Sequence, residues 1–300
     1  ETTTGASTAT AAATVASTSS GAGGGSTTSS GQGGSGAGPA KTVFGGDRAV
    51  TLHVPSDYDP ASPAPLLILL HGYGATGSVQ NGYWGLQSKA LERGMLYAYP
   101  DGNTDPTSKQ FWNATDACCD FGNSGVDDSS YLRALVEEIQ GSYNVDPKRI
   151  YFTGHSNGSY MSFRMACDHA DLIAGIAGLA GAMWSDPTKC PASEAVNVLH
   201  IHGDNDQTIA YAGSPNYPSA ADSVAFWAQK GDCDAMPTDG APIDIEGGIS
   251  GAETTVSSYA GCKAGGAAEL WTIAGGGHVP SIGANWMPSM LDWLLAHPKP

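Results

Sequence analysis

One pentapeptide of this 300-residue chain carries a clear chemical signal: Gly154-His155-Ser156-Asn157-Gly158 has the pattern G-x-S-x-G. A serine hydroxyl becomes a good nucleophile only when a base takes its proton, so its Oγ must project beyond the edge of a sheet. A sharp turn from strand to helix achieves this, and it needs glycine on both sides because a Cβ there would clash. Residues 150–153 predict the strand, and the residues through about 167 predict the helix. We therefore predict that Ser156 is a nucleophile and that the Asn157 N–H faces the oxyanion formed in acyl transfer; an ordinary Gly-Ser turn is the alternative.

A serine nucleophile of this kind needs an acid and a histidine later in the chain, in that order. After the predicted strand 196–201, the chain reads His202-Gly203-Asp204-Asn205-Asp206. After the predicted strand 270–273, a glycine-rich loop leads to His278. A lone histidine before a closing helix is ordinarily a surface or capping residue, but the matched order favours His278 as the general base. The residues alone leave Asp204 and Asp206 as competing candidates for the acid.

The oxyanion needs a second donor besides Asn157. The apolar run Leu66–Leu70 ends in His71-Gly72-Tyr73-Gly74, a loop placed to supply a backbone N–H. We expect the Tyr73 N–H to be that donor. The alternative is an ordinary glycine-rich connection from strand to helix.

The remaining pattern predicts an α/β fold. The run LLILL is continuous and apolar, which is typical of a strand buried on both faces of a parallel sheet. Strands alternate with helices along the chain, which favours a mostly parallel central sheet with helices on both faces. The other strands are expected at 49–54, 95–99, 150–153, 172–180, 196–201 and 270–273, and the helices at 129–143, 157–167, 219–230 and 285–296.

Composition divides the chain in two. Residues 1–40 are almost wholly Gly, Ser, Thr and Ala, so they have too little apolar surface to fold, and we interpret them as a disordered, flexible linker. Residues 41–300 are a normal size for one catalytic domain. The chain begins with Glu1 rather than Met, so we expect any export signal to have been removed.

The charge balance limits the partners. Thirteen basic against 29 acidic residues give a net charge of −16, which repels phosphate backbones and anionic membranes, so we expect no nucleic-acid partner. The acidity favours a neutral substrate, although it also serves simple solubility. No apolar run approaches the roughly 20 residues of a membrane span, so no transmembrane segment is expected.

The cysteines indicate an oxidising compartment. Their number is even and they form no C-x-x-C pair or metal-binding spacing, so we expect disulfides, no metal, and a secreted or surface-tethered protein. Cys233 should pair with Cys262. A bond between neighbours is strained, so we expect the adjacent Cys118 and Cys119 to pair separately with Cys167 and Cys190. Six buried free thiols in a cytosolic protein are the alternative.

Several stretches together resemble the secreted feruloyl esterase and polyhydroxybutyrate depolymerase-like family. They include LLILLHGYG, FWNATDACCD, DPKRIYFTGHSNGSYMSFRMAC, HIHGDNDQTIAY and ELWTIAGGGHVP, and the resemblance runs over essentially all of residues 41–300. It implies an α/β-hydrolase fold, secretion, disulfides, no cofactor, and hydrolysis of an ester held by a polysaccharide or polyester. The family pattern H-G-x-x-D places Asp206 at the acid position. This chain has Gln207 and Ala210 where the family has prolines, so that loop can differ in shape.

The resemblance leaves the substrate open. Feruloyl esters of plant cell-wall polysaccharide are our first expectation; short-chain polyesters and acetyl esters are the alternatives, as is a module that only binds polysaccharide on a vestigial esterase fold. Exposed tryptophans can stack on a sugar or cinnamoyl ring, so Trp184 and Trp286 are candidate substrate contacts, although each could be core. His155, beside the nucleophile, is a third candidate. We expect a monomer.

Overall fold

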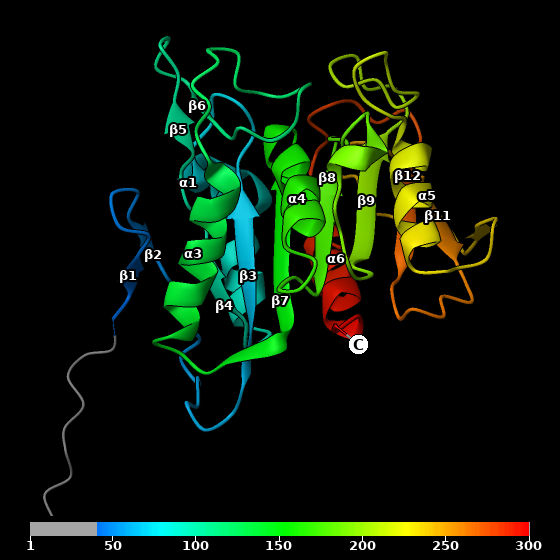
Figure 1. Cartoon of the computed structure of the whole chain (residues 1–300). Helices are drawn as coiled ribbons and strands as arrows, with labels where there is room; N and C mark the ends of the chain where they lie inside the picture. The colour runs from blue at the N-terminus through cyan, green and yellow to red at the C-terminus, as the bar shows by residue number, and fades with distance from the viewer. Residues whose placement is uncertain (1–40, 300) are drawn as a thin grey trace, which may run out of the picture. The chain divides into compact units, whose positions relative to one another are not determined.

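A computed structural model describes residues 41–299, so the predicted linker, residues 1–40, lies outside the described residues. A central sheet runs through the described part (Figure 1). Its strands are β3 (Ala64–Leu70), β4 (Leu96–Ala98), β7 (Val145–His155), β8 (Gly175–Leu179), β9 (Asn197–Gly203), β10 (Thr238–Asp239), β11 (Thr254–Tyr259) and β12 (Ala268–Ile273). Their order in the sheet is β10-β11-β12-β9-β8-β7-β3-β4. Strands from β12 to β4 are parallel to their neighbours, and β10 and β11 add an antiparallel edge.

Two short antiparallel pairs accompany the sheet. They are β1 (Val43–Phe44) with β2 (Val50–Thr51), and β5 (Asn103–Thr104) with β6 (Gln110–Phe111).

Helices cover both faces of the sheet, as predicted. One face carries α3 (Asp128–Gln140), α4 (Asn157–Asp168) and α5 (Ala220–Lys230), which lie in front of the sheet in Figure 1. The other carries α1 (Gly77–Trp84), α2 (Leu86–Leu91) and α6 (Trp286–Ala296).

The alternation along β3 explains the two layers. Leu66, Ile68 and Leu70 pack in the first core, whereas Leu67 and Leu69 pack in the second, and all five are fully buried. Because successive side chains of a strand point to opposite faces, an unbroken apolar run is what a strand between two helical layers requires.

The order of the strands creates the crevice that holds the site. The chain passes from β3 outward to β4 and then returns to β7 on the other side of β3. Ligands of open parallel sheets bind outside the carboxyl ends of the strands at such a reversal. The loops that leave β3, β7, β9 and β12 at this edge carry, in turn, Tyr73, Ser156, Asp206 and His278.

Candidate active site

Ser156 occupies a strained turn between β7 and α4. Its φ of 54° and ψ of −119° lie in a region that non-glycine residues rarely adopt, and its N–H donates to the Leu179 carbonyl over 2.8 Å. A Cβ on Gly154 would lie 2.5 Å from the backbone of Gly158, and a Cβ on Gly158 would lie 2.1 Å from the carbonyl oxygen of Leu70. These contacts explain why glycine stands on both sides of the serine.

The structure brings Ser156, His278 and Asp206 into one hydrogen-bonded series. His278 Nε2 lies 3.0 Å from Ser156 Oγ, and His278 Nδ1 lies 2.7 Å from Asp206 Oδ2. A carboxylate can only accept, so Nδ1 carries the hydrogen and Nε2 is left with a lone pair for the serine hydroxyl. Residues from three separate loops therefore have the geometry of a nucleophile, a base and its orienting acid.

The Asp206 carboxylate is held ionised. Burial alone would raise its pKa, but hydrogen bonds from His202, His278 and the N–H groups of Ile209 and Thr208 outweigh burial and lower its pKa well below the usual value. Both amides donate to Oδ1, over 2.9 Å and 2.7 Å respectively, while His202 Nε2 lies 3.2 Å from Oδ2. The carboxylate is therefore fixed in orientation as well as in charge.

Asp204, the competing acid, has a different place. Its Oδ1 accepts the Gly275 N–H over 2.6 Å. Asp204 therefore braces the glycine-rich loop that leads to His278, and the structure brings Asp206 rather than Asp204 to the histidine.

His155 contacts the base rather than the solvent. It is buried, and its Nε2 donates to the backbone carbonyl of His278 over 2.7 Å. Burial, together with the nearby His278, lowers the pKa of His155 to about 4, so the ring is neutral at neutral pH. A second donor holds the same loop: the Tyr83 hydroxyl, from α1, donates to the carbonyl of Pro280, two residues after His278, over 2.5 Å. The ring of His155 thus holds the loop of His278, and its contact with a substrate stays a prediction.

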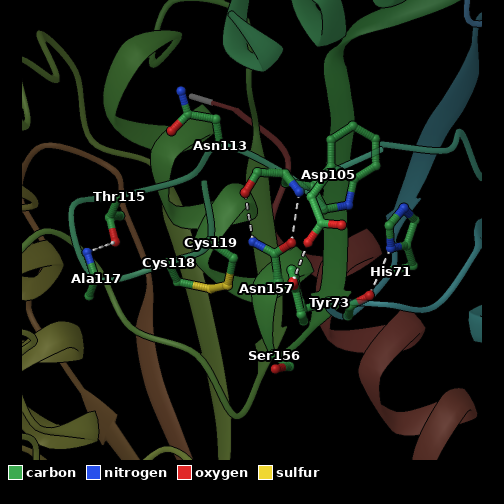
Figure 2. Close-up of a disulfide and its surroundings, with 12 residues drawn as sticks. His71, Tyr73, Asp105, Asn113, Thr115, Ala117, Cys118, Cys119, Ser156 and Asn157 are labelled. Atoms are coloured by element: carbon green, nitrogen blue, oxygen red, sulfur yellow. Dashed lines mark hydrogen bonds between the residues drawn. A yellow bond between two sulfur atoms is a disulfide. The ribbon is translucent and has the colours of Figure 1, made fainter. Parts of the chain in front are cut away.

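The loop after β3 lies directly beside the nucleophile. A Cβ on Gly72 would approach Ser156 Cβ to 3.5 Å. His71 is buried, and burial lowers its pKa; its Nδ1 donates to the Gly72 carbonyl over 2.8 Å while its Nε2 accepts the Gly102 N–H. Because the peptide is planar, fixing the Gly72 carbonyl also fixes the direction of the Tyr73 N–H (Figure 2).

Asn157 is anchored by its side chain, which leaves its backbone free to face the site. Its Oδ1 accepts the Trp112 N–H over 2.7 Å, and its Nδ2 donates to the Trp112 carbonyl over 2.9 Å (Figure 2). As the first residue of α4, it has no acceptor for its N–H within the helix. The sequence did not predict this pair of hydrogen bonds to the Trp112 backbone, because the two residues are 45 positions apart.

The cysteines pair differently from our expectation. Cys233 pairs with Cys262 as predicted, but Cys118 and Cys119 are bonded to each other across a cis peptide, with Cα atoms 3.0 Å apart. Their expected separate partners, Cys167 in α4 and Cys190, are bonded together. The end of α4 and the segment after the 3₁₀ turn Pro187–Lys189 bring the last two within 4.7 Å, Cα to Cα, so neither needs a distant partner. Figure 2 shows the Cys118–Cys119 bond in the surroundings of Asn157 and Ser156.

The two tryptophan candidates have opposite environments. Trp286 has no exposed surface and lies on the apolar face of α6 with Met287, Met290 and Leu291, so the prediction of substrate contact for it is wrong. Trp184 is half-buried in the segment after β8. Its ring lies 5.4 Å from Lys189 Nζ and lines two cavities, which are described below.

Within residues 41–299, no group of three or more His, Cys, Asp or Glu side chains is arranged to hold a metal ion. No helix in that range combines the length and apolar character needed to cross a bilayer.

The chain is similar to known esterases. A family model described as phospholipase/carboxylesterase matches residues 53–223. A putative esterase, NocK, of Nocardia uniformis subsp. tsuyamanensis is 30% identical over 79% of this chain and 71% of its own length. Feruloyl esterase B of Piromyces equi is 29% identical over 79% of this chain but only 43% of its own length.

A solved structure shows the same fold. The acetyl xylan esterase from Aspergillus awamori superposes with a TM-score of 0.58 at 16% identity, over 82% of this chain and 93% of that one. The fold is therefore that of the α/β-hydrolases, as the sequence predicted.

Proposed function

Because this chain belongs to the phospholipase/carboxylesterase family, we propose that it is a secreted serine esterase that forms an acyl-enzyme on Ser156. The observation that carries the proposal is the series from Ser156 Oγ to His278 Nε2, 3.0 Å, and from His278 Nδ1 to Asp206 Oδ2, 2.7 Å. These are the contacts that a general base and its orienting acid require.

Acylation follows from the arrangement. His278 Nε2 takes the hydroxyl proton as Ser156 Oγ attacks the ester carbonyl carbon. The negative charge that develops on the carbonyl oxygen is received by the N–H groups of Tyr73 and Asn157, each worth about 3 kcal/mol in such sites. The imidazolium, stabilised by the ionised Asp206, then protonates the departing alcohol.

Deacylation repeats these steps with water. His278 takes a proton from the water as its oxygen attacks the acyl carbon, and the same two N–H groups receive the charge. Collapse of the intermediate returns the proton to Ser156 Oγ and releases the carboxylic acid. Asp206 keeps the imidazole in the required tautomer throughout.

We assign the substrate to feruloyl esters of a neutral cell-wall polysaccharide. Aromatic surface near the loop after β3 that carries Tyr73, residues 71–74 (the oxyanion loop), supports this assignment. The exposed Phe121 ring packs edge-on against Tyr73 with centroids 5.2 Å apart. A planar cinnamoyl ring can pack against such a pair. The matched feruloyl esterase and the acidic surface, which disfavours polyanions, support the same assignment.

The test compares three esters. Initial rates are measured on methyl ferulate, p-nitrophenyl acetate and a polyhydroxybutyrate suspension with wild type, Ser156→Ala and the exposed control Ser78→Ala. We expect turnover of methyl ferulate that falls about a millionfold in Ser156→Ala and is unchanged in the control. Clearing of the polyester with negligible ferulate release would move the substrate to polyesters, and turnover of the acetate alone would move it to acetyl esters. A Ser156→Ala enzyme that kept its rate would overturn the mechanism.

Secretion is proposed from the three disulfides, because such bonds persist in oxidising compartments. Fractionation of the producing culture, followed by mass spectrometry with and without reduction, tests it. Oxidised protein in the medium is expected. Reduced protein confined to the cells would contradict the proposal.

A further inference from the structure

A second binding site is suggested by a cavity that the catalytic residues do not line. The cavity has a volume of about 670 Å³ and lies between residues 183–187, helix α5 and residues 232–235. We call it the α5 cavity. Neither Ser156, His278 nor Asp206 contributes to its wall.

The α5 cavity begins at the catalytic edge of the sheet. Trp184 follows β8, whose last residue pairs with His155 beside the nucleophile. Trp184 also lines an adjoining cavity of about 290 Å³ together with Phe121, and Phe121 packs against Tyr73 of the oxyanion loop. The α5 cavity is therefore connected to Tyr73 through the shared wall at Trp184 and the ring of Phe121.

The lining combines two kinds of side chain. Trp184, Phe226 and Tyr259 are half-buried aromatic residues, and aromatic faces pack against the C–H faces of sugar rings. Asp222 and Gln229 on the exposed side of α5 offer oxygen atoms that accept hydrogen bonds from hydroxyl groups.

The lining offers carboxylates that can accept hydrogen bonds from a sugar. Three aspartates, Asp222, Asp232 and Asp234, line the cavity. Around its rim, Lys263 pairs with Asp232, and the Nζ atoms of Lys189 and Lys230 lie 5.4 Å and 5.6 Å from the rings of Trp184 and Phe226. Hydroxyl groups of neutral sugars donate readily to the carboxylates of Asp222 and Asp234, and the protein's net charge of −16 disfavours a chain of uronic acids.

Disulfides fasten both ends of the cavity. Cys190, bonded to Cys167 of α4, ends the segment that carries Trp184, and Cys233, bonded to Cys262, lies in the opposite wall. A site whose walls are fixed before binding loses less conformational entropy when it is occupied.

We propose that the α5 cavity binds the neutral polysaccharide chain that bears the ester, several sugars away from the scissile bond. The inference rests on the proposed function, because it assigns the cavity to the alcohol side of the same substrate. It accounts for a large, partly aromatic cavity that the chemical steps leave unused.

The test separates sugar binding from hydrolysis. Isothermal titration calorimetry with unesterified xylohexaose is carried out on Ser156→Ala protein, alone and combined with Phe226→Ala, Gln229→Ala or the control Val79→Ala on α1. We expect binding that weakens about five- to tenfold with Phe226→Ala, less with Gln229→Ala, and not at all with Val79→Ala. Gln229 is exposed, so its variant keeps the test valid if Phe226→Ala fails to fold by circular dichroism.

Three outcomes would overturn the inference: no binding of xylohexaose at millimolar concentration, equal weakening by Val79→Ala, or tighter binding of a glucuronic-acid oligomer. Hydrolysis of methyl ferulate without sugar binding would refute the cavity assignment and leave the esterase intact. Sugar binding without hydrolysis of any ester would do the reverse.

Discussion

Replacing Asp206 by asparagine should abolish catalysis through the tautomer of His278. In the structure, Oδ1 of Asp206 accepts two backbone N–H groups, from Thr208 and Ile209, so the amide oxygen of an asparagine would take that position. Its NH₂ group would then stand where Oδ2 now accepts from His278 Nδ1. A donor facing a donor forces the imidazole to move its hydrogen to Nε2, which removes the base from Ser156 Oγ.

The expected loss is about 10⁴-fold in kcat, which corresponds to about 5.5 kcal/mol of transition-state stabilisation. The KM for a small ester should change little, because Asp206 does not touch the substrate. Stopped-flow release of p-nitrophenolate from p-nitrophenyl acetate measures the acylation step directly, and circular dichroism verifies the fold.

Asp204→Asn is the matched control. Asp204 is two residues away, but it only accepts the Gly275 N–H, and an amide oxygen can do the same. We expect its kcat to stay within about threefold of wild type. An Asp206→Asn enzyme within tenfold of wild type, or equal losses in both variants, would refute the assignment of roles.

Three further results are expected. His155→Phe keeps an aromatic side chain but removes the N–H that holds the His278 carbonyl, so the base should be positioned less well. The kcat on p-nitrophenyl acetate should fall about tenfold, with little change in KM. The pKa of Asp206 is lower in the folded protein than its unfolded value of about 4, so the ionised carboxylate stabilises the fold above about pH 4 and this contribution is lost as the pH falls further. In urea titrations, the difference in free energy of unfolding between wild type and Asp206→Asn should therefore be smaller at about pH 3 than at neutral pH. Cys167→Ser with Cys190→Ser opens a loop of separation 23 and should lower the free energy of unfolding by about 3 kcal/mol in denaturant titrations.

Each of these has a result that contradicts it. Tyr83→Phe, which removes the hydroxyl bond to Pro280, is the comparison for His155→Phe; a rate unchanged in both would mean that the loop holds its position without either donor. A stability difference that widens on acidification would reverse the sign assigned to Asp206. A double cysteine variant as stable as wild type would show that packing alone joins α4 to the segment at Cys190.

The parts of the fold that could be predicted are those with a local signature. The run Leu66–Leu70 required a strand between two apolar layers, and β3 is buried on both sides. Gly154 and Gly158, on either side of Ser156, indicate the close packing of β7, α4 and β3, where a Cβ would clash. The burial of Trp286 could also have been foreseen, because its spacing with Met287, Met290 and Leu291 places it on the apolar face of a helix.

Other features depend on contacts between distant residues. Nothing in the residues near Asn157 points to the Trp112 backbone, and no spacing rule shows that His155 binds the carbonyl of His278, 123 positions away. The pairing of Cys118 with Cys119 contradicts the expectation that a disulfide between sequence neighbours is too strained to form. Strand β11 was missed because its mixed polar sequence, TTVSSY, lacks the apolar signal of a buried strand.

The bond from His155 to the His278 carbonyl has a mechanical consequence. Since residue 155 is the immediate neighbour of Ser156, one imidazole ring links the nucleophile's own peptide to the backbone of the base. We expect a displacement of the β7 end to carry both reactive groups in the same direction, so that the distance from Ser156 Oγ to His278 Nε2 varies less than the position of either group.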